Sequence, residues 1–413
     1  MSGESESGGR PPHTHPGPRP GRNGYAEAPL VVTWEISQAC DLACRHCRAD
    51  ACPGRHADEL TTREGRALLE SIRGFGDPGP VVVFTGGDPL KRPDLLELIR
   101  HGTSLGLPMA VTPASTPLLT RQVLEDFSEG GVRRVALSLD GATPESHDGF
   151  RGETGSFEII RRAARDADEL GLPIQINTTV CRDTVSELPA VADLVEELGA
   201  VMWEVFFLVP VGRGSVLDPL TPWQHEGVLG WLYRRQKEAP FRLITVEAPF
   251  YRRIGRQIEV EEKARRRARG ERVDGRSGRG GVAPQGSTGD GNGFVFVSHL
   301  GEIFPSGFLP VSGGDVRTDD IVEVYRDAPL FRWLRDKELL RGKCGGCEFR
   351  QVCGGSRARA FAVSGDWLQQ DPFCPYRPEG WDSTRERAFE AFPDGPPAVP
   401  AGGRPGAGAG RDL

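Results

Sequence analysis

Short runs of β-branched and aromatic residues alternate with amphipathic stretches over the first two thirds of the chain. The β-rich runs predict strands at residues 29–37, 81–86, 107–113, 133–140, 173–180 and 201–210. Between them, apolar residues recur at helical spacing and predict helices at 61–72, 93–106, 156–171 and 187–199. Thr61 and Glu64 form a capping box, and Thr221-Pro222 starts a further helix.

Strands that alternate with helices indicate an α/β fold, with a parallel sheet and helical crossovers. The pattern by itself allows either a doubly wound sheet or a full or partial barrel. In both architectures, the chemistry collects at the carboxyl ends of the strands.

The last third of the chain has a different pattern. Residues 293–307 predict a hairpin with its turn near Leu300-Gly301, and a short helix is expected at 328–340 before a cysteine-rich segment. Both ends are rich in Gly and Pro and poor in apolar residues, which predicts disorder. We therefore divide the chain into a disordered leader (1–28), an α/β domain (29–250), a basic and Gly-rich linker (251–292), a small second domain (293–380), and a short helical stub with a disordered tail (381–413).

Composition and charge narrow the classes of function. The 413 residues carry a net charge of −7, which gives no reason to expect nucleic acid or an anionic membrane as partner. The basic run at 252–279 is better explained as a solvated helix face and a loop than as a nucleic-acid arm. No stretch approaches the roughly 18–20 apolar residues that cross a bilayer. The start lacks a secretory signal, so the nine cysteines are expected to be free, catalytic or metal-bound in a reducing cytoplasm.

Three cysteines with the spacing C-x3-C-x2-C follow the first predicted strand: Cys40, Cys44 and Cys47. Three thiolates this close can ligate three irons of one cubane and leave the fourth iron without a protein ligand. A zinc ion would need a fourth ligand, which His46 or Cys52 could supply. Chance clustering is a third interpretation. The position at the end of a strand favours chemistry.

This triplet resembles the fingerprint of the radical S-adenosylmethionine (SAM) superfamily, whose fold is a partial (β/α)6 TIM-like barrel. The resemblance covers roughly residues 29–240. Residues 84–90 (FTGGDPL) match the family's "GGEP" segment, with Asp in place of the usual Glu. The resemblance implies that this segment contacts the SAM ammonium group, through Gly86, Gly87, Asp88 and Pro89.

A second matching segment ends the fourth strand. Residues 138–141 (SLDG) and 147–151 (HDGFR) look like the family's "SxDG…HDxxR" pattern, which implies SAM contacts by Ser138, Asp140 and Arg151. An arginine fork suits the SAM carboxylate. Asn177 is a candidate contact to the ribose or sulfonium group, or else a polar core residue. His46 stands where the family usually has an aromatic residue that packs over the adenine, and an imidazole can stack there too.

Four more cysteines lie near the C-terminus with the spacing C-x2-C-x5-C and a distant fourth: Cys344, Cys347, Cys353 and Cys374. Composition alone allows a four-thiolate zinc site. The pattern resembles the SPASM/twitch extension of radical SAM maturases, which implies one auxiliary [4Fe-4S] cluster. A full SPASM domain holds a second cluster, but Ser306 and Arg357 stand where its cysteines would be. One closed cluster favours electron relay over substrate ligation. Cys181 is expected to be a packed core residue, and Cys52 could be a spare thiol.

The radical SAM resemblance implies reductive cleavage of SAM to a 5′-deoxyadenosyl radical that abstracts a substrate hydrogen, with an electron donor such as flavodoxin or ferredoxin. Residues 40–51, 298–310 and 344–376 look closest to the branch that makes haem by the alternative route and d1-type haem, which acts on tetrapyrrole propionates. Arginines that could pair with propionates, or else be structural, are Arg213, Arg357 and Arg359. Aromatic residues that could wall a flat substrate, or else belong to the core, are Trp203, Phe206 and Phe207.

Two other functions compete with this one. SPASM-type enzymes also modify ribosomally made peptides, although the disordered leader leaves no room for the peptide-binding domain that many of them carry. A non-catalytic iron–sulfur or zinc protein is a third interpretation. The segments 86–89 and 138–151 argue against it, because a sensor or scaffold needs no pockets for an ammonium and a carboxylate group.

Overall fold

The fold is taken from a computed structural model, which describes residues 25–271 and 288–382. In these ranges ten strands form a single sheet in the order β10-β9-β8-β1-β2-β3-β4-β5-β6-β7. Their bounds are Val31–Ser37 (β1), Val81–Gly86 (β2), Met109–Val111 (β3), Val132–Ser138 (β4), Ile174–Val180 (β5), Met202–Phe207 (β6), Arg242–Val246 (β7), Phe294–Val297 (β8), Glu302–Phe304 (β9) and Gly314–Asp315 (β10).

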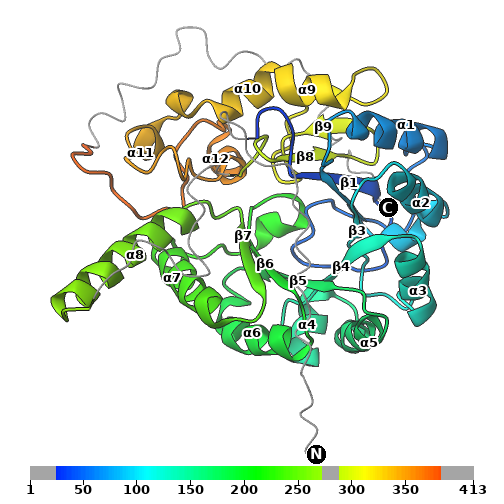
Figure 1. Cartoon of the computed structure of the whole chain (residues 1–413), viewed down its shortest axis with the longest axis horizontal. Helices are drawn as coiled ribbons and strands as arrows, with labels where there is room; N and C mark the ends of the chain where they lie inside the picture. The colour runs from blue at the N-terminus through cyan, green and yellow to red at the C-terminus, as the bar shows by residue number, and fades with distance from the viewer. Residues whose placement is uncertain (1–24, 272–287, 383–413) are drawn as a thin grey trace, which may run out of the picture.

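Most helices lie along the outside of the curved sheet (Figure 1). Their bounds are Thr62–Arg73 (α1), Leu95–Ser104 (α2), Arg121–Glu129 (α3), Pro144–Arg151 (α4), Ser156–Glu169 (α5), Leu188–Glu197 (α6), Pro222–Glu238 (α7), Tyr251–Ala268 (α8), Ile321–Asp327 (α9), Pro329–Arg335 (α10), Gly342–Gly345 (α11) and Arg357–Ser364 (α12). None of the helices in the described ranges is long and apolar enough to cross a membrane.

The strand order decides between the two architectures that the sequence allows. Strands β1 to β7 are parallel, and each one pairs with the next along the chain. A doubly wound sheet would reverse direction at a switch point, whereas this sheet winds one way and curls with its helices outside. Among the described strands, β7 and β10 stand at the two edges, so the barrel is partial.

The expected strands and helices of the barrel are confirmed, with three additions. The capping boxes at Thr61–Glu64 and Thr221–Gln224 are both formed. Strand β7 and helices α3 and α4 were not expected from the pattern. Helix α3 buries only Leu124 and Phe127, and β7 is five residues long with an exposed arginine at its start. All of the missed elements are short, so the sequence offers few residues from which to recognise them.

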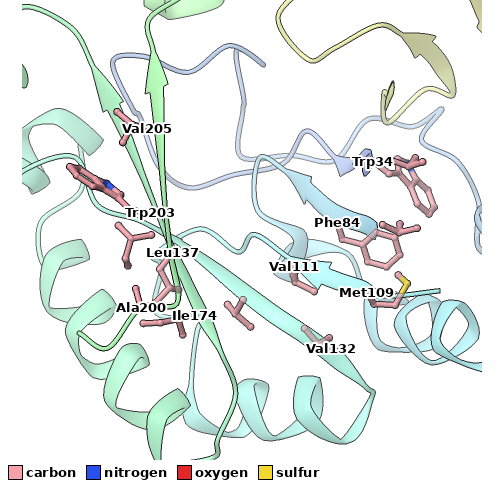
Figure 2. Packing of buried hydrophobic residues seen from close by; sticks show 14 of the residues in the cluster. Trp34, Phe84, Met109, Val111, Val132, Leu137, Ile174, Ala200, Trp203 and Val205 are labelled. Atoms are coloured by element: carbon pink, nitrogen blue, oxygen red, sulfur yellow. The ribbon is translucent and has the colours of Figure 1, made fainter. Parts of the chain in front are cut away.

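The main core lies between the sheet and the outer helices. Trp34, Phe84 and Met109 point into this layer from β1, β2 and β3. Trp203 points into it from β6, several strands further along the sheet (Figure 2). Along β6 the side chains alternate, so Trp203 and Phe207 are buried on the helix side, 0% and 1% exposed. The Trp203 indole donates to the Thr178 hydroxyl at 2.9 Å. The interpretation that Trp203 and Phe207 wall a substrate is therefore wrong, because neither side chain reaches the inside of the barrel.

The C-terminal third is joined to the barrel more closely than the predicted boundaries suggest. Strand β8 pairs in parallel with β1, from Val31–Phe294 to Trp34–Val297, and the expected hairpin continues through β9. Residues 251–268, placed in the predicted linker, form helix α8. Residues 1–24, 272–287 and 383–413, which include most of the predicted leader and tail, lie outside the described residues. At the start of the described chain, the Tyr25 carbonyl accepts a hydrogen bond from Tyr325 at 2.6 Å.

Candidate functional site

The cysteine triplet lies in the loop that follows β1. Cys40 and Cys44 are buried among Leu42, Ala51 and Ala114, and Cys47 packs against them. Burial raises the pKa of the Cys40 thiol to about 12. A thiol in such an apolar setting gives up its proton when a bound metal withdraws it. The loop therefore brings the three predicted ligands together in one apolar cluster after the carboxyl end of β1, which fits an iron–sulfur cluster with three protein ligands.

The residues that hold this loop in place come from far along the chain. Arg213 donates from Nε to the Cys44 carbonyl and from Nη1 to the Ala51 carbonyl, both at 3.0 Å. Its backbone N–H donates to the Cys47 carbonyl at 2.9 Å. At Gly212, where φ is +53°, a Cβ atom would come within 2.6 Å of the Cys47 oxygen. The interpretation of Arg213 as a propionate ligand is therefore wrong: its guanidinium is used to clamp the cysteine loop.

The GGDP segment after β2 presses against the same loop. A Cβ at Gly86 would lie 2.2 Å from the Ser37 oxygen, and one at Gly87 would lie 2.4 Å from the Ala39 oxygen. Only glycine leaves room for this approach. The Asp88 carboxylate is fully buried and accepts from Leu90 N at 3.1 Å and Thr116 Oγ1 at 2.9 Å. This carboxylate joins the loops after β2 and β3. Because it is buried and already hydrogen-bonded, only the backbone of Asp88 is available to contact a ligand. Pro89 follows at the start of a 3-10 helix, Pro89–Lys91.

Arg151 and Asp140 form a buried pair beside the triplet. Arg151 Nε lies 2.7 Å from Asp140 Oδ2, and Arg151 Nη1 lies 3.5 Å from Cys44 Sγ. Burial raises the pKa of Asp140, but the charge of Arg151, the two neighbouring histidines and the hydrogen bond from the Thr179 N–H together lower that pKa below its usual value. Asp140 Oδ1 also accepts from the Thr179 N–H at 2.6 Å. Asp140 thus orients Arg151, whose fork faces the cysteine loop.

His46 is held next to this pair by an aromatic stack. Its ring is stacked on Phe150, with centroids 4.8 Å apart and planes within 9°. His46 Nε2 lies 3.8 Å from Asp140 Oδ2, and burial lowers the pKa of His46 to about 4. Its Nδ1 is buried without a hydrogen-bond partner among the described residues. A neutral ring with a free nitrogen here is suited to contact with a planar ligand.

Ser138, the last residue of β4, lies beside Asn177 in the middle of β5, because the two are paired in the sheet register. Gln175 Nε2 donates to Asn177 Oδ1 at 2.7 Å and to Glu204 Oε2 at 2.7 Å. Asn177 is paired in turn with Glu204 on β6. Because its oxygen is already an acceptor, Asn177 is left with its amide N–H groups to offer a ligand. Sequence reasoning missed Gln175 and Glu204, which carry no motif.

The four C-terminal cysteines surround one cavity. Its lining includes Arg253, Lys343 and Arg350 together with the four thiols Cys344, Cys347, Cys353 and Cys374. Cys344 Sγ accepts from the Asp371 N–H at 3.4 Å, and Cys353 Sγ accepts from the Gly355 N–H at 3.4 Å. Burial raises the pKa of Cys353 to about 12 and that of Cys374 to about 11.

Cations approach the same sulfur atoms. Arg253 Nη2 lies 3.9 Å from Cys374 Sγ, and Arg357 Nη2 lies 3.9 Å from Cys344 Sγ. Positive charge and N–H donors thus face the thiols, as a negatively charged cluster requires. Within the described ranges, no three His, Cys, Asp or Glu side chains are arranged to hold a single metal ion.

Hydrogen bonds occupy the two positions where a second SPASM cluster would need cysteines. The Ser306 hydroxyl donates to the Asp290 carboxylate, and Asp290 Oδ2 also accepts from the N–H groups of Arg357 and Ala358, both at 3.1 Å. Asp290 thereby caps the start of α12. Where a full SPASM domain would have a cluster-ligating cysteine, Ser306 instead orients the carboxylate that caps this helix.

Two further arginines are buried in this segment and do not face open space. The Arg357 guanidinium donates to the carbonyls of Trp367 at 2.7 Å and Gln369 at 2.6 Å. Arg359 is 0% exposed and is paired with Asp371 at 2.8 Å. The interpretation of Arg357 and Arg359 as propionate ligands is therefore wrong. Of the two spare cysteines, Cys181 is buried and Cys52 is exposed.

Known proteins share this arrangement over most of the chain. The family model described as "Radical SAM superfamily" matches residues 34–195. A Methanosarcina barkeri protein named AdoMet-dependent heme synthase is 40% identical over 351 residues, which cover 85% of this chain and 97% of that protein. A protein of the same name from Nitratidesulfovibrio vulgaris is 38% identical over 372 residues, covering 90% of this chain and 98% of its own.

Among solved structures, Streptococcus suis SuiB bound to its precursor peptide SuiA has a TM-score of 0.65 at 16% identity. The match covers 85% of this chain and 76% of SuiB, and it shows a shared fold. These sequence matches cover most of the chain and nearly all of the relatives, and the relatives are named as synthases. The chain therefore belongs to the radical SAM superfamily of enzymes.

Proposed function

We propose that this enzyme removes carboxylate groups from propionate side chains of a tetrapyrrole, as a step in making haem. The observation that supports this most directly is the 40% identity to a protein named AdoMet-dependent heme synthase, over 85% of this chain and 97% of that protein. The N-terminal triplet and the C-terminal cysteine cavity supply the two redox positions that such a conversion needs.

Membership of the superfamily implies a four-iron cluster and SAM, which together supply a 5′-deoxyadenosyl radical when bound. We assign Cys40, Cys44 and Cys47 as the cluster ligands, because they are packed together at the end of β1. Arg151 is assigned to the SAM carboxylate because its fork faces this loop, with Ser138 beside it.

The other SAM contacts follow from the loops that meet the triplet. The backbone of residues 86–89 suits the SAM ammonium group, since glycines bring that segment into direct contact with the loop after β1. Asn177 offers its amide N–H to the ribose or sulfonium region. The side chains of Asp88 and Asp140 are assigned a positioning role, because each is hydrogen-bonded within the protein.

We assign the four C-terminal cysteines to one auxiliary [4Fe-4S] cluster. Removing one hydrogen atom from a propionate and releasing its carboxylate as CO2 leaves a vinyl group and one surplus electron. The site therefore requires a one-electron acceptor besides the SAM-derived radical. A cavity ringed by Cys344, Cys347, Cys353 and Cys374 and faced by Arg253 and Lys343 is suited to a redox cluster of negative charge.

The thiolate clusters also bear on the cellular compartment in which the reaction takes place. Iron–sulfur clusters of this kind need a reducing compartment, so we propose a cytoplasmic enzyme supplied with electrons by a flavodoxin or a ferredoxin.

The test is a turnover experiment with the anaerobically reconstituted full chain. Dithionite, SAM and iron-coproporphyrin III are added, and the porphyrin products and 5′-deoxyadenosine are followed by mass spectrometry. We expect porphyrins that have lost carboxylate groups, with one 5′-deoxyadenosine formed for each group lost. Cys44→Ala is the control for SAM-dependent chemistry. Cleavage of SAM with an unchanged porphyrin would overturn the proposal and favour a peptide substrate; bound zinc in place of iron would refute the auxiliary cluster.

A further inference from the structure

Glu247 has a backbone conformation that its side chain disfavours. It follows β7 directly, with φ at +58°, and among the described residues only Asp50 shares a positive φ without being glycine. Asp enters this left-handed region readily because its short side chain hydrogen-bonds locally, whereas Glu does not. Strain of this kind persists where the surrounding structure imposes it, and it gathers at functional sites.

Glu247 lies where the barrel meets the C-terminal segment. The carboxyl end of β7 is at the same edge of the sheet as the ends of β1, β4 and β5, which carry the SAM-site residues. Ser356, the cap residue of helix α12, donates from Oγ to Glu247 Oε2 at 2.5 Å. This bond ties the strained residue to the segment that carries the cysteine cavity.

The neighbouring acids are better supplied with donors than Glu247 is. Asp290 accepts from the Ser306 hydroxyl and from the N–H groups of Arg357 and Ala358. Asp371 is paired with Arg359. Glu247 accepts a single hydrogen bond, and both its burial and the charge of Asp290 hold its pKa well above the usual range.

Glu247 is therefore the acid of this group whose charged form is least stabilised by its surroundings. Its Oε1 has no hydrogen-bond partner among the described residues and is not sealed from solvent, and the residue is half-buried. A neutral carboxylic acid is a strong donor to an anionic oxygen. By contrast, the three arginines that the sequence suggested as carboxylate ligands are all bound to other groups in the protein.

We propose that Glu247 contacts the substrate and donates a hydrogen bond from its carboxylic acid to a carboxylate group of that substrate. The inference rests on the proposed function, which supplies a substrate with several propionates. The described contacts of Glu247 include none of the residues assigned to SAM, so we expect it to act on binding and placement of the substrate and to leave SAM cleavage intact.

Two variants separate this role from a structural one. Glycine adopts a positive φ without strain, so Glu247→Gly removes the donor while relieving the backbone. We expect its thermal melting temperature to match or exceed that of the wild type. We expect its dissociation constant for iron-coproporphyrin III to rise about tenfold or more, as for loss of a hydrogen bond to a charged group. Glu247→Gln keeps an N–H donor and should lose less affinity.

The ligand supplies the matched control. The tetramethyl ester of the same porphyrin has neutral ester carbonyls in place of carboxylates, and these are weaker acceptors, so Glu247→Gly should lose much less affinity for the ester than for the free acid. Three results would each overturn the inference. Both proteins bind the free acid equally, Glu247→Gly loses as much affinity for the ester as for the free acid, or Glu247→Gly has a lower melting temperature than the wild type. If the wild type converts iron-coproporphyrin III and Glu247→Gly binds and converts it identically, only this inference is refuted. If the wild type neither binds nor converts iron-coproporphyrin III, the proposed function is refuted as well.

Discussion

Replacing Arg213 with alanine is expected to loosen the loop that carries the cysteine triplet. The substitution keeps the backbone hydrogen bond to Cys47 and removes the two side-chain bonds to the carbonyls of Cys44 and Ala51. Each hydrogen bond from a charged donor contributes about 1.5–3 kcal/mol net. Arg213 is partly exposed, so the two bonds together stabilise the docked loop by about 2–4 kcal/mol. This is a factor of about 30 to 1,000 in the docking equilibrium.

Anaerobic transfer of iron to a chelator measures this effect. If the N-terminal cluster is lost through opening of the loop, Arg213→Ala should release its iron faster by that factor. Iron in the C-terminal site is an internal reference, since Arg213 does not contact it. Arg121→Ala is the matched control, because its pairs with Glu125 and Glu169 are on the surface, where solvent screens them, and they are far from both cysteine groups in the sequence.

Two results would refute the reasoning about Arg213. Unchanged iron release in Arg213→Ala would show that the two bonds do not hold the loop. Weaker binding of iron-coproporphyrin with unchanged iron release would return Arg213 to the role of a propionate ligand.

The remaining predictions concern the two cysteine groups and the pH. Cys44→Ala should abolish formation of 5′-deoxyadenosine. Cys347→Ala should retain SAM cleavage, bind about half of the roughly eight irons expected for two four-iron clusters, and lose porphyrin turnover; retained turnover would show that the auxiliary site is dispensable. Burial lowers the pKa of His147 from 6.5 to about 4. As the pH falls, the unfolded chain therefore binds this proton before the folded chain does. The contribution of His147 to the free energy of unfolding is complete above about pH 6.5, and between about pH 6.5 and pH 4 it falls by about 1.4 kcal/mol per pH unit. Urea titrations across this range should show the slope, and His147→Gln should reduce it.

Features that depend on neighbouring residues could be predicted from the sequence. The capping box at Thr61 and Glu64 forms because its two members are three residues apart on one helical turn. The triplet Cys40, Cys44 and Cys47 comes together for the same reason, since a short loop cannot place these thiols far apart. The alternation of strands and helices likewise predicted the parallel sheet, because each unit buries its apolar face in a characteristic period.

The roles of single long side chains could not be predicted in this way. Arg213 and Arg359 are ordinary arginines in the sequence, and only the fold brings one to the cysteine loop and the other to Asp371. Trp203 and Phe206 are three residues apart in a strand, so they face opposite sides, and the side that faces the helices depends on the curl of the sheet. Glu247 gave no signal, since a backbone dihedral is a property of the folded chain.

The sequence by itself determined the fold class, the two cysteine groups and the superfamily, because periodicity and short spacings act over one turn or one loop. Only the tertiary structure decided that the sheet winds one way, that β8 extends the barrel at β1, and which arginines are free to meet a ligand. The physical reason is the range of the interactions. Hydrogen bonds such as that between Arg213 and Cys44 join residues 169 positions apart, and they exist only after burial of the core has brought those segments together.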